Sequence, residues 1–441
     1  MNVTKSQCPY CGVGCGLKMR PKNSVSDDKW LVSGDRDTPS TLGKLCVKGA
    51  TVCETLKDGR LKEPLYRKNL NEEFKKISWD ESYEILKENI LSSIKNYGPD
   101  SIAMYGSGQF HTEDYYIAQK LLKGAIGTNN FDANSRLCMS SAVAGYNRSF
   151  GSDGPPCCYE DIDHCSSIFL IGTNTAECHP VLFDRIKKRK RNVNDNLKVI
   201  VIDPRETETA SIADFYLQIA SGTDLFLFIG IANYLYKNKL TEQNFIEKST
   251  ENYDHFVKHI QKWDLKKISE ICNISKQEII DIAKLWGESK NVLSLWSMGL
   301  NQRQEGTATV NGLINLHLMT GQLGKAGAGP FSLTGQPNAM GGREAGGLSH
   351  LLPGYRFVKN KIDRNEIEKI WGFPIGKISE KQGLSAWEQI EAINKGTVKI
   401  WWIAATNPLV SMPNLNFVKK ALLKCPFIIL NESYEQSESI K

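Results

Sequence analysis

Four cysteines near the amino terminus have the spacing of an iron–sulfur site. Cys8, Cys11 and Cys15 form a Cys-x2-Cys-x3-Cys run, and Cys46 follows later in the chain. A [4Fe-4S] cube takes three thiolates from one tight loop and a fourth from elsewhere. Structural zinc is the alternative, but zinc sites usually pair two C-x2-4-C units. The spacing therefore favours an electron-carrying cluster over zinc.

A fifth cysteine, Cys138, stands directly before a segment with helical spacing through Ala142 and Tyr146. A thiol at a helix N-terminus meets the positive end of the helix dipole, which favours the thiolate. Such a thiolate suits either metal coordination or attack on an electrophile. The local sequence leaves both roles open.

Glycine turns after buried strands are candidate cofactor sites. Residues 101–105 predict a strand that runs into the turn 106–109, and a helix through Ile117 and Leu122 follows. Strand, glycine turn and helix together present backbone N–H groups to a phosphate. Further glycine-rich segments later in the chain would let the backbone approach a ligand closely.

The same order recurs with a clearer pattern between residues 168 and 202. A strand at 168–171, the turn 172–174, a helix at 180–190 and a strand at 197–202 make one βαβ unit. The turn lacks the G-x-G-x-x-G fingerprint of ordinary nicotinamide sites. Asp203 follows the second strand, where an acid can hold a ribose hydroxyl. Alternatively, Asp203 only caps a turn before Pro204.

The rest of the chain alternates short apolar runs with amphipathic stretches, which predicts an α/β fold. A helix is expected to begin after Ser78, where Ser78 and Glu81 form a capping box, and to end at Gly98, with Tyr83, Leu86, Ile90 and Ile94 on its apolar face. Residues 398–430 predict a closing strand, helix and strand.

Composition limits the class of protein. The chain has 441 residues, is 41% hydrophobic and carries a net charge of +6, well short of a nucleic-acid-binding signature. Twelve cysteines indicate a reducing compartment. The start MNVTKSQCPY has no signal peptide, and the longest apolar stretch, 225–232, is too short to cross a bilayer. We therefore expect a cytoplasmic protein without membrane or nucleic-acid partners.

Several motifs together make a family resemblance. They are the cysteine head with Lys48, and NSRLCMSSAVAGY, GSDGPPCCYED, IGTNTAECHP, SMGLNQ and TGQPNAMGGREAGG. From Cys8 to about Glu432 the chain resembles the cytoplasmic assimilatory nitrate reductases of bacteria and cyanobacteria. These belong to the molybdopterin oxidoreductase (dimethyl sulfoxide reductase) family. The resemblance implies three cofactors: a [4Fe-4S] cluster, molybdenum and bis-molybdopterin guanine dinucleotide.

Residue roles follow from the matching positions. The resemblance implies that Cys8, Cys11, Cys15 and Cys46 hold the cluster and that Cys138 binds molybdenum. Lys48 matches the lysine between cluster and pterin. The remaining cofactor contacts implied by the matching motifs are Gln109, Asn134, Gly172, Asn174, Glu177, His179, Asp203, Arg205, Gly222, Thr223, Asp224, Met298, Gly299, Gln302, Asn407, Glu432 and Ser433.

The implied reaction is the reduction of nitrate to nitrite by oxygen-atom transfer, with electrons delivered through the cluster. Cys138, Lys48, Arg343 and Met139 are the catalytic candidates. A guanidinium matches a planar oxyanion, so Arg343 is expected to attract nitrate. Alternatively, Arg343 pairs with Glu344 or with a cofactor phosphate. Met139 either lines the cavity or belongs to the core.

Two other functions stay open. The first is a formate dehydrogenase or another oxyanion oxidoreductase of the same family, because family members also use other substrates. Formate dehydrogenases typically carry histidine after the metal-binding residue, where this chain has Met139, and this difference favours nitrate. The second alternative is an inactive remnant that binds a cluster or no cofactor. It arises because family members continue into a C-terminal β-barrel domain to which nothing here corresponds, so the chain looks truncated after Tyr434.

The resemblance also implies the domain organisation. Residues 1–55 form a small [4Fe-4S] domain, residues 56–134 and 336–441 form one αβα domain, and residues 135–335 form a second αβα domain inserted into it. The absence of flavin and nicotinamide motifs suggests ferredoxin, flavodoxin or a separate reductase subunit as the electron donor.

Overall fold

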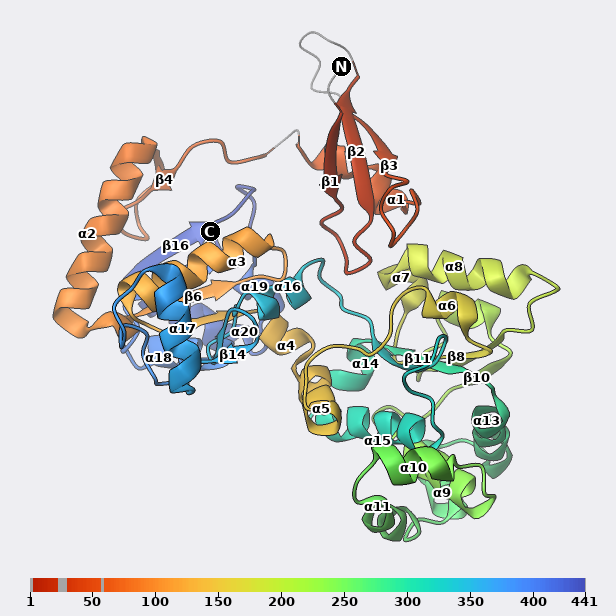
Figure 1. The fold of residues 1–441 in the computed structure, drawn as a ribbon. Helices are drawn as coiled ribbons and strands as arrows, with labels where there is room; N and C mark the ends of the chain where they lie inside the picture. The colour runs from red at the N-terminus through yellow and green to blue at the C-terminus, as the bar shows by residue number, and fades with distance from the viewer. Residues whose placement is uncertain (1–2, 23–29, 57–58, 441) are drawn as a thin grey trace.

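The computed structural model describes residues 3–22, 30–56 and 59–440, and its fold confirms the predicted α/β class. Figure 1 shows two α/β units side by side, with a small β-rich domain at the amino end above them. No helix in this described part of the chain is long and apolar enough to cross a membrane.

The amino-terminal domain is an antiparallel three-stranded sheet followed by short helical turns. Its strands are β1 (Thr4–Gln7), β2 (Gly16–Pro21) and β3 (Trp30–Gly34), in the order β1-β2-β3. The helix α1 (Val47–Ala50) and the 3-10 turn η1 (Val52–Leu56) follow. A two-stranded ribbon of β4 (Leu65–Tyr66) and β5 (Lys75–Lys76) comes next in the chain.

The unit at the right of Figure 1 is built on a five-stranded parallel sheet in the order β10-β9-β8-β11-β12. Its strands are β8 (Ser167–Ile171), β9 (Lys198–Ile202), β10 (Phe215–Leu217), β11 (Val292–Trp296) and β12 (Gly329–Ser332). The βαβ unit predicted from residue 168 to 202 is confirmed by β8, α8 and β9.

Helices cover both faces of this sheet. One face packs on α5 (Ser140–Phe150), α9 (Asp224–Lys237), α12 (Leu265–Cys272), α13 (Lys276–Glu288) and α15 (Gly306–Met319). The other face packs on α8 (Pro180–Arg191) and on apolar residues of the amino-terminal domain. The shorter helices of this unit are α6 (Asp161–His164), α7 (Thr175–Cys178), η4 (Glu208–Ile212), α10 (Gln243–Ser249), α11 (Tyr253–Ile260) and α14 (Met298–Asn301).

The unit at the left has a four-stranded parallel sheet in the order β16-β15-β6-β7. Its strands come from distant parts of the chain: β6 (Ile102–Gly106), β7 (Phe131–Ala133), β15 (Ile400–Ala404) and β16 (Phe427–Asn431). The chain therefore leaves this sheet after β7, builds the five-stranded sheet, and returns. All five strands of the other sheet lie within the range 135–335 predicted for the inserted domain, whose limits stay a prediction.

The helices of the four-stranded unit again lie on both faces. The helices α18 (Ala386–Asn394) and α20 (Leu415–Lys424) pack on one face. The other face packs on α2 (Trp79–Tyr97), α3 (Thr112–Gln119) and the π-helical segment η3 (Lys120–Ile126). The remaining elements are η2 (Pro99–Ser101), α4 (Ser135–Cys138), α16 (Ala339–Glu344), β13 (Leu351–Leu352), β14 (Arg356–Phe357), α17 (Lys361–Trp371) and α19 (Pro408–Ser411).

The helix predicted from Ser78 has the expected ends but not the expected face. Ser78 accepts a hydrogen bond from the Glu81 backbone N–H, and the helix stops at Gly98. Tyr83, however, is 59% exposed, and its ring lies tilted against that of the equally exposed Trp79, with 5.9 Å between the ring centroids. Only Ile90 and Ile94 of the predicted face pack against the sheet core. The placement of Tyr83 on the buried face was therefore wrong.

Candidate redox site at the junction of three domains

The four amino-terminal cysteines converge because two segments turn back on each other. Cys8 and Cys15 close the β1–β2 hairpin, where the Cys8 N–H donates to the Cys15 carbonyl at 2.8 Å. Cys11 lies in the loop between them, where Gly14 adopts a positive φ of 65°. Cys46 stands at the N-terminus of α1. Cys8 and Cys15 are buried, and Cys11 and Cys46 are partly buried.

Electrostatics show that these thiols share one environment. Burial is the largest cause that raises the pKa of Cys8, Cys11 and Cys15, and the neighbouring cysteines, Cys46 included, raise all three in the same direction. Together these effects raise the Cys15 pKa to about 12, while Lys48 lowers the pKa values of Cys8 and Cys11. Iron would stabilise the thiolates that burial disfavours.

The number of thiols matches the ligand set of a cluster. A cube takes four cysteine ligands, one on each iron. Cys8, Cys11, Cys15 and Cys46 are four free cysteines that act on one another electrostatically.

The cluster loop docks on the five-stranded unit through its backbone. The Gly12 N–H donates to the Gly335 carbonyl at 3.0 Å, and the Tyr159 hydroxyl donates to the Gly12 carbonyl at 2.8 Å. A Cβ atom on Gly12 would collide with the Thr334 carbonyl. Only glycine allows this close approach.

Lys48 bridges the amino-terminal domain and the turn after β8. Its Nζ donates to the Glu177 carbonyl at 3.3 Å, and its charge lowers the pKa of His179 in addition to the larger effect of burial. The predicted place of this lysine was between the cluster and a cofactor. In the structure, Lys48 donates to the turn after β8 and acts electrostatically on Cys8 and Cys11 of the cysteine loop.

Cys138 ends the short helix α4 and lies against Gly335. A Cβ on Gly335 would stand 3.9 Å from the Cys138 sulfur, and the Gly335 backbone hydrogen-bonds the thiol. Burial raises the Cys138 pKa more than this bond and the Arg343 charge lower it. Burial therefore opposes the thiolate that the helix N-terminus is expected to favour, and a bound metal would stabilise that thiolate.

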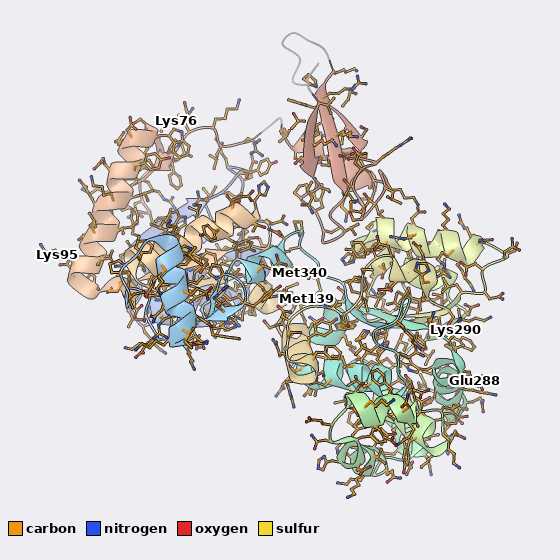
Figure 2. All side chains as sticks on the ribbon, in the orientation of Figure 1. Lys76, Lys95, Met139, Glu288, Lys290 and Met340 are labelled. Atoms are coloured by element: carbon orange, nitrogen blue, oxygen red, sulfur yellow. The ribbon has the colours of Figure 1, made fainter. Side chains whose placement is uncertain are left out.

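Side chains from α14 and the residue after it hold the Cys138 backbone. The Asn301 amide donates to the Cys138 carbonyl at 2.7 Å, and the Gln302 amide donates to the Leu137 carbonyl at 2.8 Å. Met139 is only 2% exposed and belongs to the core of the five-stranded unit, which supports the core alternative. Figure 2 shows Met139 and Met340 in the region between the two α/β units.

Arg343 forms a buried ion pair that joins the two α/β units. Its Nε stands 2.5 Å from Oδ2 of Asp153, with side-chain exposures of 7% and 8%. The second oxygen of Asp153 has no hydrogen-bond partner within the described residues. The sequence analysis offered Glu344 as a possible partner of Arg343. Glu344 is exposed, and the carboxylate that pairs with Arg343 is that of Asp153.

The Gly172 turn is locked against α14. Gly172 has a φ of 53°, and its carbonyl accepts from the Gly299 N–H at 3.1 Å. The Asn174 side chain donates to Glu177 and accepts from the Thr209 hydroxyl. His179 is buried, its Nε2 contacts the Thr334 carbonyl at 2.9 Å, and its Nδ1 has no partner in the described chain.

The predicted nucleotide end lies at the tips of β9 and α9. The Asp203 carboxylate accepts from the Arg205 N–H at 2.9 Å, so Asp203 does cap the turn before Pro204. Asp224 is buried and pairs with Arg303 at 2.8 Å; burial raises its pKa, and Arg303 opposes that rise. Arg303 also donates to the Gly222 carbonyl, and the Thr223 hydroxyl donates to the Ala220 carbonyl. Sequence reasoning missed Arg303, which carries no motif of its own.

Asn134 ties the glycine turn after β6 to the strand β15. Its side-chain oxygen accepts from the Gly108 N–H at 3.0 Å, and its amide nitrogen lies 3.2 Å from the Ser107 hydroxyl and 3.4 Å from the Thr406 hydroxyl. The Gln109 side chain is exposed. Met298, the neighbour of Gly299, lies against Gly335.

The residues predicted to meet the second dinucleotide carry the end of the described chain. The Asn407 amide donates to the Glu438 carboxylate at 2.8 Å, and its oxygen accepts from the Ser439 hydroxyl at 2.5 Å. The Glu432 carboxylate accepts from the Ser433 N–H at 2.6 Å. The contact between Asn407 and residues 438–439 was not predicted from the sequence.

Comparison with known proteins identifies the class. Residues 1–58 match the molybdopterin oxidoreductase Fe4S4 domain, and residues 60–439 match molybdopterin oxidoreductase. The chain belongs to the molybdopterin oxidoreductase family, whose two domains carry an Fe4S4 cluster and a molybdenum–molybdopterin cofactor.

Three relatives show the particular proteins to which the chain is similar. It is 51% identical to a nitrate reductase of Synechocystis sp., 41% to a periplasmic nitrate reductase of Desulfovibrio desulfuricans and 36% to the assimilatory nitrate reductase catalytic subunit of Bacillus subtilis. The alignments cover 99%, 99% and 96% of this chain but 62%, 59% and 59% of the relatives. The chain thus spans about three fifths of their length.

A solved structure shares the fold. Acetylene hydratase from Pelobacter acetylenicus superposes with a TM-score of 0.77 over 98% of this chain and 60% of its own, at 19% identity. At this identity the likeness speaks for the fold alone.

The described residues fit the family's cofactors. The four amino-terminal cysteines act on one another electrostatically. Cys138 offers a soft sulfur ligand, and its neighbour Gly335 places no side chain beside that sulfur. The unpartnered Nδ1 of His179 and Oδ1 of Asp153 are buried polar atoms that a bound polar group could satisfy.

Proposed function

We propose that this chain takes part in the molybdenum-dependent reduction of nitrate to nitrite by oxygen-atom transfer, in cytoplasmic nitrate assimilation. The observation that carries the proposal is Cys138 beside Gly335 and near Arg343, in a chain 51% identical to a nitrate reductase. The proposed domain limits are 1–55 for the cluster, 135–335 for the insertion, and the two flanking ranges for the first αβα domain.

The proposed cofactor is bis-molybdopterin guanine dinucleotide. Cys138 would bind the metal, the Gly172 turn with Asn174 and His179 would hold one dinucleotide, and Asn407 would face the other. When bound, the cofactor supplies a metal centre that exchanges an oxygen atom and two electrons with the substrate. The glycines let backbone N–H groups approach phosphates without side-chain obstruction.

Arg343 is proposed to attract and orient the anion. Its charge acts on Cys138, and its Nε is held by Asp153, which leaves the terminal nitrogens of the guanidinium for a planar oxyanion. Lys48 is proposed to assist electron delivery, because it contacts the turn after β8 and acts on two cluster cysteines. The donor is proposed to be ferredoxin, flavodoxin or a separate reductase subunit; the net charge of +6 suits an acidic donor.

The test is metal analysis combined with a redox assay on the full chain, expressed in a host that makes the pterin cofactor. We expect about four irons and one molybdenum per chain, and oxidation of reduced viologen when nitrate is added. Cys138→Ser should lose the molybdenum and keep the iron, whereas Cys425→Ser, remote in sequence from every predicted metal ligand, should keep both. Zinc or empty sites would contradict the proposal and support a remnant. Turnover with formate but not with nitrate would instead indicate a formate dehydrogenase.

A further inference from the structure

A partly buried network of charged and polar groups includes Arg136, two residues before Cys138. Arg136 grips Asp132 with two parallel hydrogen bonds, Nε to Oδ2 at 3.0 Å and Nη2 to Oδ1 at 3.1 Å. Asp132 is completely buried at the middle of β7. Such a fork fixes both distance and orientation, since the guanidinium and carboxylate planes must coincide. It ties α4, the helix that ends in Cys138, to the four-stranded sheet.

The same network reaches the segment that follows Arg343. The Nη2 atom of Arg136 lies 3.2 Å from Nδ1 of His350. Lys123, fully buried in the π-helical segment η3, donates to the carbonyls of Gly346, Leu348 and Leu351 at 3.1, 2.8 and 2.5 Å. These carbonyls lie within eight residues of Arg343 in the chain.

Asp132 joins the two sides of the network. Besides Arg136, it accepts from the Ser349 N–H at 3.4 Å and from the N–H of Ala386, the first residue of α18, at 2.7 Å. His350 stays neutral near pH 7, because burial, Arg136 and Lys123 lower its pKa to about 4. Its Nδ1 therefore accepts from Arg136, and its Nε2 carries the ring proton.

Such a network is costly if its only role is stability. Arg136 and Lys123 both act electrostatically on the buried Asp132 carboxylate or are acted on by it, and burial lowers the Lys123 pKa to about 7. Apolar residues of similar volume would often stabilise a core as well or better. The hydrogen bonds of the network restrict the orientation of the groups that they join, because a hydrogen bond weakens steeply when its angle changes. Besides the start of α18, its members contact α4, which ends in Cys138, and residues 346–351, which follow Arg343.

We propose that Asp132 and Arg136, supported by Lys123 and His350, are positioning residues that set where the Cys138 sulfur stands relative to Arg343. The consequence for substrate rests on the proposed nitrate reduction. The position of the sulfur does not, and it can be measured separately.

The first experiment compares Arg136→Lys with a matched control in the full chain, purified from a host without the pterin cofactor. Lysine keeps the charge and loses the fork. Arg189→Lys removes an equivalent fork, on Asp195 at 2.7 Å for both bonds, far from Cys138 in sequence. The readout is the rate of alkylation of Cys138 by iodoacetamide, followed by peptide mass spectrometry, with buried Cys272 as the internal reference.

Arg136→Lys should speed alkylation of Cys138 roughly tenfold, the size expected from losing a charge-assisted hydrogen bond. Cys272 should not change, and Arg189→Lys should leave both rates as they were. Equal rates for Cys138 in Arg136→Lys and the unchanged chain would overturn the proposal. So would a parallel rise at Cys272, because it would mean general loosening. If Arg136→Lys does not fold, His350→Gln, which leaves the fork on Asp132, should show a smaller rise in the same direction.

The second experiment uses the chain loaded with cofactor. Arg136→Lys should keep its molybdenum but broaden the Mo(V) electron paramagnetic resonance signal, and it should lower kcat for nitrate more than it changes KM. A Mo(V) signal identical to that of the unchanged chain would count against positioning. If the unchanged chain does not reduce nitrate while the alkylation result holds, the proposed function fails and the positioning role stands.

Discussion

The two α/β units share one plan but differ in how completely their parallel sheets are covered. In the five-stranded unit, β8 and β11 are buried at every position. In the four-stranded unit, β16 is only partly buried and its last residue is exposed, and α2 keeps Trp79, Tyr83, Leu91 and Tyr97 exposed. Parallel sheets are stable when both faces are covered. The first sheet is thus covered on both faces, one of them partly by the amino-terminal domain, whereas the second unit leaves apolar surface open along α2 and β16.

The difference extends to the predicted cofactor contacts. In the five-stranded unit, Gly172 and Gly299 are locked by direct backbone contact, and Asp224 is locked by a buried ion pair with Arg303. In the four-stranded unit, Asn407 is engaged by Glu438 and Ser439 from a nearby part of the chain. The predicted cofactor contacts of the five-stranded unit are held by its core, and Asn407 of the four-stranded unit is held by side chains near the surface. Substitutions should therefore change the stability of the two units unequally.

The largest effect is expected from a tryptophan in the core of the five-stranded unit. Trp286 is 1% exposed, and its ring centroid lies 4.7 Å from that of Phe169. Trp286→Ala should lower the free energy of unfolding by about 3–5 kcal/mol. Trp79→Ala, at a residue 59% exposed, should change it by less than about 0.5 kcal/mol. Urea unfolding followed by far-UV circular dichroism measures both, and a large loss for Trp79 would mean that α2 is covered.

A smaller effect is expected from a Cβ atom at the Gly172 turn. Gly172→Ala would place its Cβ 2.9 Å from Gly299 at a φ of 53°, so strain and collision should together cost about 3 kcal/mol. Gly324→Ala has the matching control geometry, a φ of 73° with nothing within 4 Å, and should cost about 1 kcal/mol. Equal losses of stability in the two variants would show that the contact with Gly299 is loose.

Acid should weaken the five-stranded unit through His317. This histidine is fully buried, bonds Ser294 at 2.7 Å, and has a pKa lowered by burial to about 3. Its folded-state pKa lies below the unfolded value, so the unfolded chain binds the proton first and stability falls as pH drops from about 6.5 towards 3. Between pH 7 and pH 5 the loss should be about 2 kcal/mol from this residue.

The measurement is urea unfolding at both pH values. His317→Gln should remove about 2 kcal/mol of the difference in unfolding free energy between pH 7 and pH 5. His255→Gln, at an exposed histidine, should leave that difference unchanged. An unaltered pH dependence in His317→Gln would show that the ring is solvated in the folded protein.

The smallest effect is expected where residues 438–439 meet Asn407. Replacing both Glu438 and Ser439 by alanine should cost less than about 1 kcal/mol, because the contacts lie near solvent. Hydrogen exchange should nevertheless quicken in residues 434–440. Ser411→Ala, which removes a different hydrogen bond to Asn407, should not change exchange there. Unchanged exchange in the double variant would mean that other contacts hold this segment.

Local patterns predicted the parts of the fold and site that depend on local residues. The cysteine run, the Gly172 turn and the strands around it could be read from spacing, because turns and buried strands restrict which residues can occupy them. The partners with which the site side chains form hydrogen bonds and ion pairs could not be predicted from spacing. Asp153 and Arg343 are 190 residues apart, and Arg303 carries no motif.

Burial limits two of the local expectations. Tyr83 follows the helical period of its neighbours but faces solvent, and Cys138 adjoins a helix N-terminus but has a pKa raised by burial. In both, the burial of the residue decides the outcome, and burial is set by elements distant in the sequence. Periodicity shows which side chains share a face of a helix; tertiary packing determines whether that face is covered.

The stretch Thr334–Gly335 receives three separate partners: Gly12 from the cluster loop, His179 from the turn after β8, and the Cys138 thiol. On the stretch itself, every one of these bonds ends on a main-chain atom. Substitution of the Thr334 side chain therefore leaves the bond to His179 in place. A proline at position 12, which has no N–H, or an insertion between 332 and 338 would break these main-chain bonds. The connection thus depends on glycine at position 12 and on the length of the 332–338 segment, and not on the side chain at position 334.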